Sequence, residues 1–429
     1  MMQIIQNIKN NRLYIISSLI IFVLLNISYV FDVSPKFDHT YLPFLYVFNL
    51  SKFIIISILS IFITTVGAHI KSEFIRLIWF IVLVMQYYSS AILYAYIPDI
   101  SFGVVFQYII LLLVLFFADY FKTDIKLPSI SLVNNHKIFM LLSVVLFTPF
   151  IYYYWQFISI GDLFLNKEDV SQTRALFRTV NIPFLGYLIS PLSRVLFPVL
   201  MVYSIKSRKY YLFVISAMAI AYLFLCSATK SVLVGGILSV FFYYGDRWRD
   251  KFKLFSLLLI LLLIISFVAS NFFSMKLITD AFVRRVFFVP PYLDNIYHYY
   301  FTDNFTYWGH SPFGMHIHDV SFMNGKGISM FIGEDVLNFE GLNANIGIIT
   351  EGYLSFGFIG VFMHSLAFAS IFVYIRILKI SPHYFGIVFA YLFYLNSSLL
   401  STLLITHGLL FLLLIFTLFL QNTKENFDN

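Results

Sequence analysis

The chain has 429 residues, of which 60% are hydrophobic and only 11% charged, with 52 Phe and 30 Tyr. A composition this apolar excludes a water-soluble domain of the same size, so we expect the chain to fold in a lipid bilayer. The net charge of +7 predicts no nucleic-acid partner, because most of it falls in loops that orient a membrane protein.

Hydrophobic runs of roughly 17 to 25 residues recur along the chain, and each can cross about 30 Å of hydrocarbon as a helix. Nothing alternates with a period of two, which excludes a barrel. We therefore predict an all-α polytopic membrane protein with about twelve transmembrane helices. Their expected ranges are 13–31, 43–68, 77–97, 101–121, 138–158, 183–205, 210–227, 229–244, 254–270, 346–378, 384–401 and 403–420.

Basic residues gather in every second connection between these helices, which is the loop bias that orients membrane proteins. We expect these connections, and with them both termini, to face the cytoplasm. No small-residue cleavage site follows the first apolar run, so that run is expected to remain as the first helix. The basic residues are Lys71, Arg76, Lys122, Lys126, Lys137, Lys206, Arg208, Lys209, Arg247, Arg249, Lys251, Lys253, Arg376 and Lys379.

The opposite face carries two substantial loops, and the longer one has about 75 residues, far beyond the usual connection. Its aromatic run VFFVPPYLDNIYHYYFTDNFTYWGHSPFG favours packing over disorder, so we expect short helices within it. The predicted regions are a nine-helix membrane region over 1–270 with a smaller loop near 159–182, the large external loop 271–345, a three-helix membrane region 346–420 and a tail 421–429.

Three stretches resemble the O-antigen polymerase (Wzy) family of oligosaccharide repeat-unit polymerases. The segment NANIGIITEGYLSFGFIGVF at 343–362 is similar to the family segment that follows the large loop. The run RRVFFVPPYLDNIYHYY at 284–300, followed by YWGHSP, is similar to the Arg, Pro and aromatic pattern inside that loop. In SATKSVLVGG at 227–236, related proteins often carry Arg at the position of Lys230. Arg174 is followed by eleven residues before Gly186, whereas one family pattern has ten.

The resemblance implies that a glycan passes from one undecaprenyl diphosphate carrier to the non-reducing end of a repeat unit on another. It places this reaction at the periplasmic face of the bacterial inner membrane, and the product is O-antigen or a similar surface polysaccharide. The implied partners are the undecaprenyl-diphosphate-linked oligosaccharide, membrane lipid and a co-polymerase that regulates chain length.

The reaction has two requirements: the departing diphosphate must be stabilised, and the attacking hydroxyl must lose a proton. The sequence has no DxD-like pair on the external face and no metal-spaced cluster of His or Asp. We therefore expect no metal and no cofactor, with Arg and Lys holding the diphosphate.

Arg174 and Arg178 are the first candidates for diphosphate binding, because their i, i+4 spacing places both guanidinium groups on one face of a helix. They also suit anionic lipid headgroups or the nearby carboxylates Glu168 and Asp169, and that alternative stays open.

Arg194 and Lys230 lie within or beside apolar helices, where an ionisable group is costly and usually functional. Snorkelling to the interface is the alternative for Lys230. Arg284 and Arg285 open the aromatic run of the large loop, and the resemblance makes them candidate catalytic residues. At least one of them has Asp280 as an alternative partner.

His310, in YWGHSPFG, is our first candidate for the proton acceptor, because Gly and Pro fix its backbone and imidazole titrates near neutral pH. Glu351 is a candidate base or Arg partner near the start of the tenth helix. That helix, at about 33 residues, is too long for one straight span, so a re-entrant or interfacial start is expected. The glycines that permit a break are Gly352, Gly357 and Gly360.

Four residues are candidates for binding sugar. Asn343 and Asn345 can bond sugar hydroxyls or cap the following helix. Tyr300 and Trp308 can stack on the apolar faces of sugars. His364, inside a helix, is expected to pack or hydrogen-bond rather than to catalyse.

Three rival functions remain. An O-antigen ligase shares the architecture and donor but transfers the glycan to lipid A core. A lipid-linked oligosaccharide flippase, which is a transporter, fits many helices with intramembrane charges, although the halves show no repeat and alternating access does not require the long loop. A membrane O-acyltransferase is disfavoured because no catalytic His and acidic pair appears among the first helices.

Overall fold

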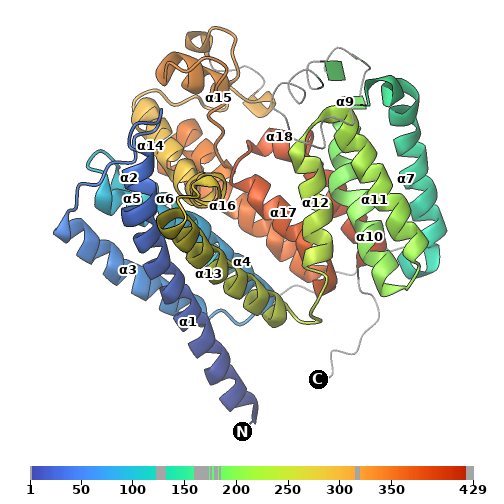
Figure 1. Cartoon of the computed structure of the whole chain (residues 1–429), viewed down its shortest axis with the longest axis horizontal. Helices are drawn as coiled ribbons and strands as arrows, with labels where there is room; N and C mark the ends of the chain where they lie inside the picture. Colours follow the sequence, from blue (N-terminus) through green and yellow to red (C-terminus); the bar gives the residue numbers. More distant parts are fainter. Residues whose placement is uncertain are drawn as a thin grey trace. The chain divides into compact units, whose positions relative to one another are not determined.

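The structure of the chain is a computed structural model in which every regular element is a helix (Figure 1). The expectation of an all-α protein is confirmed for the residues that the structure describes. These are residues 2–121, 132–158, 185–314 and 319–421, with 173, 176–177 and 182.

Nine helices in the described ranges are long and apolar enough to cross a membrane. Three shorter apolar helices, Phe102–Ala118, Val232–Phe241 and Pro382–Leu395, coincide with three more of the predicted ranges. The chain is thus a candidate multi-pass membrane protein, while the total of twelve spans stays a prediction. The nine are Asn11–Phe37, Leu50–Ala68, Glu73–Tyr96, Asn135–Phe157, Leu185–Lys206, Tyr210–Ser227, Trp248–Phe272, Ile348–Ile377 and Leu400–Leu420.

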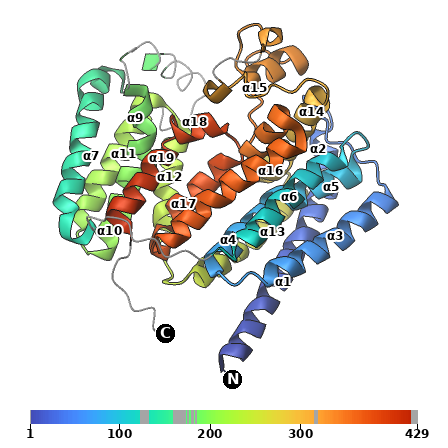
Figure 2. The ribbon, with the colours of Figure 1, turned by 180° about the vertical axis from the view of Figure 1, so that it is seen from behind.

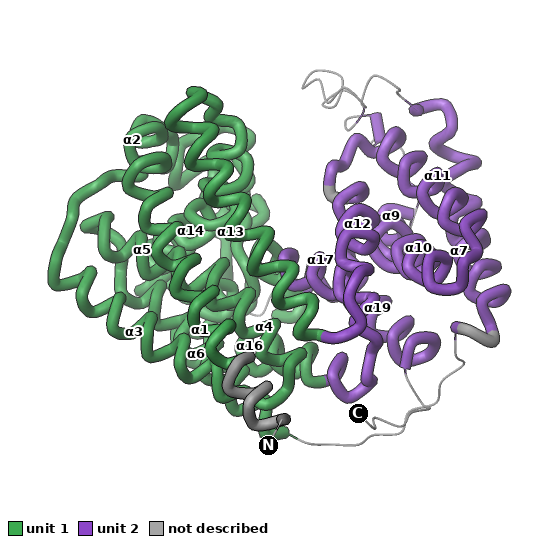
Figure 3. The backbone as a smooth tube through the Cα atoms, turned by 60° about the horizontal axis from the view of Figure 1, so that its bottom comes forward, with its two compact units in different colours: residues 1–122, 248–373, 395–400 green, residues 123–247, 374–394, 401–429 purple. Residues whose placement is uncertain are grey.

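The chain divides into two compact units (Figure 3). Both predicted membrane regions, 1–270 and 346–420, contribute to each unit, whereas the predicted loop 271–345 belongs to unit 1. Unit 1 comprises 1–122, 248–373 and 395–400, and unit 2 comprises 123–247, 374–394 and 401–429.

The core of unit 1 is the almost completely buried run Glu73–Tyr96, which consists of α4 (Glu73–Val82), η2 (Leu83–Tyr87) and α5 (Tyr88–Tyr96). Its middle and end carry the polar residues Gln86, Ser89 and Ser90, all of them buried, as in a helix surrounded by other helices. The surrounding helices, several of which are visible in Figure 2, are α1 (Met2–Ser28), α3 (Leu50–Ala68), α6 (Phe102–Ala118) and α13 (Trp248–Phe272).

Unit 2 is built in the same way around the run Leu185–Lys206, which consists of α9 (Leu185–Pro191), η5 (Leu192–Leu196) and α10 (Phe197–Lys206). This run is mostly buried, and its polar residues Ser193, Arg194 and Ser204 are buried with it. Its neighbours are α7 (Leu132–Tyr154), α11 (Tyr210–Ser227), α12 (Lys230–Phe241) and α19 (Leu409–Ile415).

Short helices fill the predicted large loop, as expected from its aromatic content. Among them, α14 packs against α5 and α6, so this segment is part of the body of unit 1. The helices are η6 (Thr279–Phe288), α14 (Val289–Phe301), η7 (Pro312–Gly314), η8 (Ser321–Met323), α15 (Ile328–Phe331) and η9 (Ile332–Val336).

The long helix α16 (Ile348–Ile377) is broken near its start. The backbone leaves the helical region at Phe356 and at Gly357, whose φ is +61°. Glycine adopts this conformation without the steric cost that a Cβ brings. The break therefore falls at one of the glycines that the sequence suggested.

The first segment of α16 folds back on the second. A Cβ on Gly352 or on Gly360 would overlap the backbone of the other. The Nδ1 atom of His364 lies 2.7 Å from the carbonyl oxygen of Ile348, although a straight helix would separate these residues by about 24 Å. The segment 348–355 is therefore a short helix that lines the interior of unit 1.

Candidate active site

A tight turn in the large loop carries the aromatic and histidine residues of YWGHSP. Tyr307 and Trp308 have φ values of +46° and +62°, a region that costs L-residues roughly 1–2 kcal/mol each. The N–H groups of Gly309 and Ser311 close the turn on the carbonyl oxygens of Thr306 and Trp308, at 2.7 and 2.8 Å. Such strain persists only where surrounding contacts enforce it, and it is frequent at functional sites.

The broken helix α16 supplies those contacts. The N–H of Thr306 donates to the carbonyl oxygen of Leu354 at 2.9 Å, and the N–H of Tyr307 donates to that of Ser355 at 3.2 Å. Both carbonyls lie at the end of the first segment, where the break removes their helical partners. The break at Gly357 and the strained turn therefore stabilise each other.

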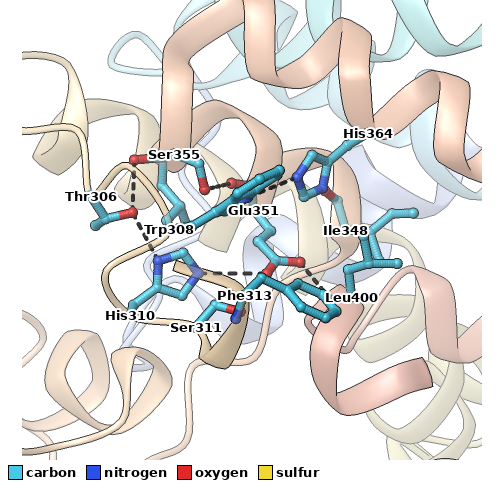
Figure 4. Close-up of polar contacts among 11 residues, drawn as sticks. Thr306, Trp308, His310, Ser311, Phe313, Ile348, Glu351, Ser355, His364 and Leu400 are labelled. Atoms are coloured by element: carbon cyan, nitrogen blue, oxygen red, sulfur yellow. Dashed lines mark hydrogen bonds and ion pairs between the residues drawn. The ribbon is translucent and has the colours of Figure 1, made fainter. Parts of the chain in front are cut away.

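The turn directs His310 toward Glu351 of α16 (Figure 4). Nε2 of His310 lies 3.5 Å from Oε1 of Glu351, and both side chains are fully buried. The other carboxylate oxygen, Oε2, accepts a hydrogen bond from the N–H of Leu400 at 2.5 Å. Two residues that the sequence selected separately thus form one pair.

Hydrogen bonds assign the protons around this pair. The Thr306 hydroxyl lies 3.3 Å from the carbonyl oxygen of Leu354, which can only accept, and 2.8 Å from Nδ1 of His310. The hydroxyl can donate to Leu354 and accept from Nδ1–H, and in that tautomer Nε2 carries a lone pair. Nε2 and Oε1 of Glu351 have no hydrogen-bond partner in the described part of the chain.

Trp308 lies between the two segments of α16. Its indole N–H donates to Nε2 of His364 at 3.2 Å, so Nδ1 of that ring carries the proton and donates to Ile348. The indole ring meets Phe356 edge-on, with the ring centroids 5.2 Å apart. His364 is thus a hydrogen-bonding residue, in line with its sequence interpretation, and it fixes Trp308.

A second buried network, which the sequence analysis missed, joins α6, α14 and α16. Asp294 accepts hydrogen bonds from the Tyr108 hydroxyl at 2.6 Å and from the Thr350 hydroxyl at 2.7 Å. The Gln107 amide donates to Thr350 at 3.2 Å, and its oxygen lies 2.9 Å from Nε2 of His298. The available signal was Gln107, a polar residue inside the apolar run of α6.

Burial changes the pKa values of two residues in this network, Asp294 and His298. Burial raises the pKa of Asp294 to about 6, although hydrogen bonds from Thr350 and Tyr108 act in the other direction. Burial also lowers the pKa of His298 to about 3. The His298 ring is therefore neutral near pH 7, and because Nε2 donates to Gln107, Nδ1 is an acceptor.

Arg284 and Arg285 lie on η6. Arg284 is 5% exposed, and its Nε donates to Asp280 at 2.7 Å while the guanidinium covers the ring of Phe37 at 4.9 Å. The side chain of Arg285 is 65% exposed and lies 4.0 Å from the same carboxylate. Asp280, the alternative partner considered from the sequence, is therefore the partner of Arg284 in the structure.

The other candidate cations lie in unit 2 or outside the described residues. Arg194 is buried in η5, with its guanidinium 4.0 Å from the ring centre of Tyr394. Lys230 is exposed at the first residue of α12. Arg174 and Arg178 lie outside the residues that the structure describes.

The remaining sugar-binding candidates lie near the start of α16 and on α14. Asn343 and Asn345 are exposed, and the Asn343 side-chain oxygen accepts from the Ser329 hydroxyl at 3.5 Å. Tyr300 is half-buried, with its ring 5.4 Å from that of Phe331.

No group of three or more His, Cys, Asp or Glu side chains is placed to hold a metal ion in the described ranges. Metal independence stays a prediction.

Fold and site together define an all-helical candidate membrane protein with a buried histidine–carboxylate pair. Comparison with protein-family models, curated proteins and solved structures finds no match. The resemblance to O-antigen polymerases depends on the sequence motifs alone.

Proposed function

We propose that the chain polymerises undecaprenyl-diphosphate-linked oligosaccharide repeat units on the periplasmic face of the bacterial inner membrane, as a metal-independent glycosyltransferase. One observation carries the proposal. Two stretches that belong to the resemblance to the polymerase family, YWGHSP and NANIGIITEGY, meet in space, and the residues that meet are His310 and Glu351.

The pair suits removal of a proton from a sugar hydroxyl. The acceptor oxygen bonds to the anomeric carbon of the donor glycan, and the bond from that carbon to the diphosphate oxygen breaks. The hydroxyl proton moves to Nε2 of His310, and the Glu351 carboxylate stabilises the resulting imidazolium. Undecaprenyl diphosphate leaves with the electron pair of the broken bond.

The leaving diphosphate requires fixed positive charge. Arg285 is the exposed cation of η6, and Nη1 of Arg284 has no hydrogen-bond partner in the part of the chain that is described. We assign these two groups to the diphosphate. Further candidates from the sequence are Arg174, Arg178, Arg194 and Lys230.

The His310 ring is fully buried, so the acceptor reaches Nε2 only when the turn 306–311 moves. The strain at Tyr307 and Trp308 lowers the cost of that movement, because opening the turn releases it. A buried pair that substrate uncovers also keeps water away from the donor.

The test uses the purified full chain in lipid nanodiscs with undecaprenyl diphosphate carrying one repeat unit, with EDTA present. A ladder of products on a gel supports the polymerase and its metal independence together. Transfer that requires lipid A core identifies a ligase instead. No transfer with either acceptor, with or without added Mg²⁺, overturns the proposal and favours the transporter.

A further inference from the structure

A cleft of about 480 Å³ opens in unit 1 where α6, α14 and α16 meet. Its volume lies within the range of ligand pockets, roughly 300–1,000 Å³. The cleft is not formed by His310 or Glu351: its lining includes His298 and Asn295 of α14, Gly103 and Phe106 of α6, and Tyr353 and Phe358 of α16.

Nδ1 of His298 is positioned in this cleft to form a hydrogen bond with a ligand. His298 is 3% exposed, its Nε2 is bonded to Gln107, and its Nδ1 has no hydrogen-bond partner in the described ranges. The ring is held parallel to Tyr353, with the centroids 3.5 Å apart and the planes at 8°. A Cβ on Gly103 would lie 3.2 Å from Nδ1, so the glycine leaves the space before this atom open.

Aromatic rings form the apolar wall of the cleft. Phe358 meets Phe106 edge-on at 5.2 Å and Tyr353 edge-on at 5.3 Å, and the two phenylalanines are about two-fifths exposed. Exposed rings beside convergent polar groups suit a ligand with both C–H faces and hydroxyls.

The charges of the cleft exclude an anionic group. None of the described residues that line it is a lysine or arginine, and the lining includes the Asp99 carboxylate. Nδ1 of His298 is an acceptor, because burial lowers the pKa of the ring to about 3. A diphosphate finds no partner here, whereas a neutral ligand that donates hydroxyl hydrogen bonds does.

We propose that this cleft binds a neutral sugar unit of the oligosaccharide, with a sugar hydroxyl donating to Nδ1 of His298 and the apolar sugar face against the aromatic wall. The inference rests on the proposed function for the identity of that oligosaccharide. Tyr353 and Glu351 are two residues apart on a helical segment, so the cleft and the His310 pair lie on opposite sides of it. Only an extended oligosaccharide reaches both, which makes the cleft a site that selects for repeat units of several sugars.

The test measures binding apart from catalysis. The probe is the free oligosaccharide repeat unit, released by mild acid from the lipid-linked precursors of the source cells. It is titrated against the full chain in nanodiscs, which avoids sugar-based detergents, and binding is followed by saturation-transfer NMR. The variant Gly103→Ala places a methyl group before Nδ1 in a helical position that tolerates alanine. Gly327→Ala, with open space around the added Cβ, is the matched control.

The expected result is wild-type binding that Gly103→Ala weakens at least about fivefold and Gly327→Ala leaves unchanged, as loss of one hydrogen bond predicts. Equal binding by wild type and Gly103→Ala, or no binding by wild type, overturns the inference. The inference is also overturned, in favour of a lipid site, when the only binding that Gly103→Ala loses is that of undecaprenyl phosphate without sugar. Polymerisation is measured in parallel. Sugar binding without a product ladder contradicts only the proposed function. A product ladder together with unaltered sugar binding by Gly103→Ala contradicts only the assignment of the cleft as a sugar site.

Discussion

The buried pair Asp294 and His298 makes opposite contributions to stability as the pH changes. Both groups are held away from water, so folding favours the neutral form of each. The pKa of Asp294 rises from 3.8 to about 6, and that of His298 falls from 6.5 to about 3. These changes correspond to about 3 and about 5 kcal/mol, as orders of magnitude.

The sign follows from which state binds more protons. Between about pH 4 and 6 the folded protein keeps a proton on Asp294 that the unfolded chain has lost, so this group lowers the stability as the pH rises. Between about pH 3 and 6.5 the unfolded chain holds a proton on His298 that the folded protein lacks, so this group raises the stability as the pH rises. In the wild-type protein the two effects largely cancel between pH 4 and 6.

Single variants separate the two contributions. Relative to wild type, Asp294→Asn becomes more stable as the pH rises from 4 to 6 and then levels off, by up to about 3 kcal/mol. His298→Gln becomes less stable relative to wild type over pH 3 to 6.5. Thermal unfolding followed by intrinsic fluorescence in nanodiscs across this range is the assay. Difference curves that are flat, or an Asp294→Asn curve that falls with pH, would refute the burial argument.

Two further substitutions test the packing of unit 1. Gly360→Ala places a methyl group against the Gly352 carbonyl and should cost about 1–3 kcal/mol, seen as a lower unfolding temperature, whereas Gly327→Ala should change little. Asp280→Asn removes the charge that pairs with the buried Arg284 and should cost about 1–3 kcal/mol in the same assay; a change below about 0.5 kcal/mol would show that the pair contributes nothing.

The helices were predictable because hydropathy is a local property of the sequence. In the part of the chain that is described, apolar helices lie in all twelve expected ranges. Nine of these helices are both long enough and apolar enough to span a membrane. The break in α16 was also visible, since Gly357 supplies a conformation that other residues avoid and the run was too long for one span. Burial of particular helices was not predicted, because hydropathy does not separate a helix inside the bundle from one at its surface: Glu73–Tyr96 is almost completely buried, whereas less than half of the more apolar Trp248–Phe272 is buried.

The partners of the polar residues could not be read in the same way. Gln107 and Thr350 are 243 positions apart, and no spacing rule joins them. His310 and Glu351 were each selected for local reasons, and only the fold of the turn against α16 reveals that they meet. Arg284 had two possible roles in the sequence, and its distance from Asp280 shows that the carboxylate is its partner.

The most direct test of the central claim is the polymerisation rate of His310→Gln with undecaprenyl-diphosphate-linked repeat units. Glutamine can still bond to Thr306 but cannot take the proton from the acceptor hydroxyl. The account predicts that kcat falls by roughly 10²- to 10⁴-fold with little change in KM, as expected for loss of a general base. A kcat within about threefold of the wild-type value, in a variant that folds normally, would contradict the assignment of His310 and Glu351 as the proton-accepting pair.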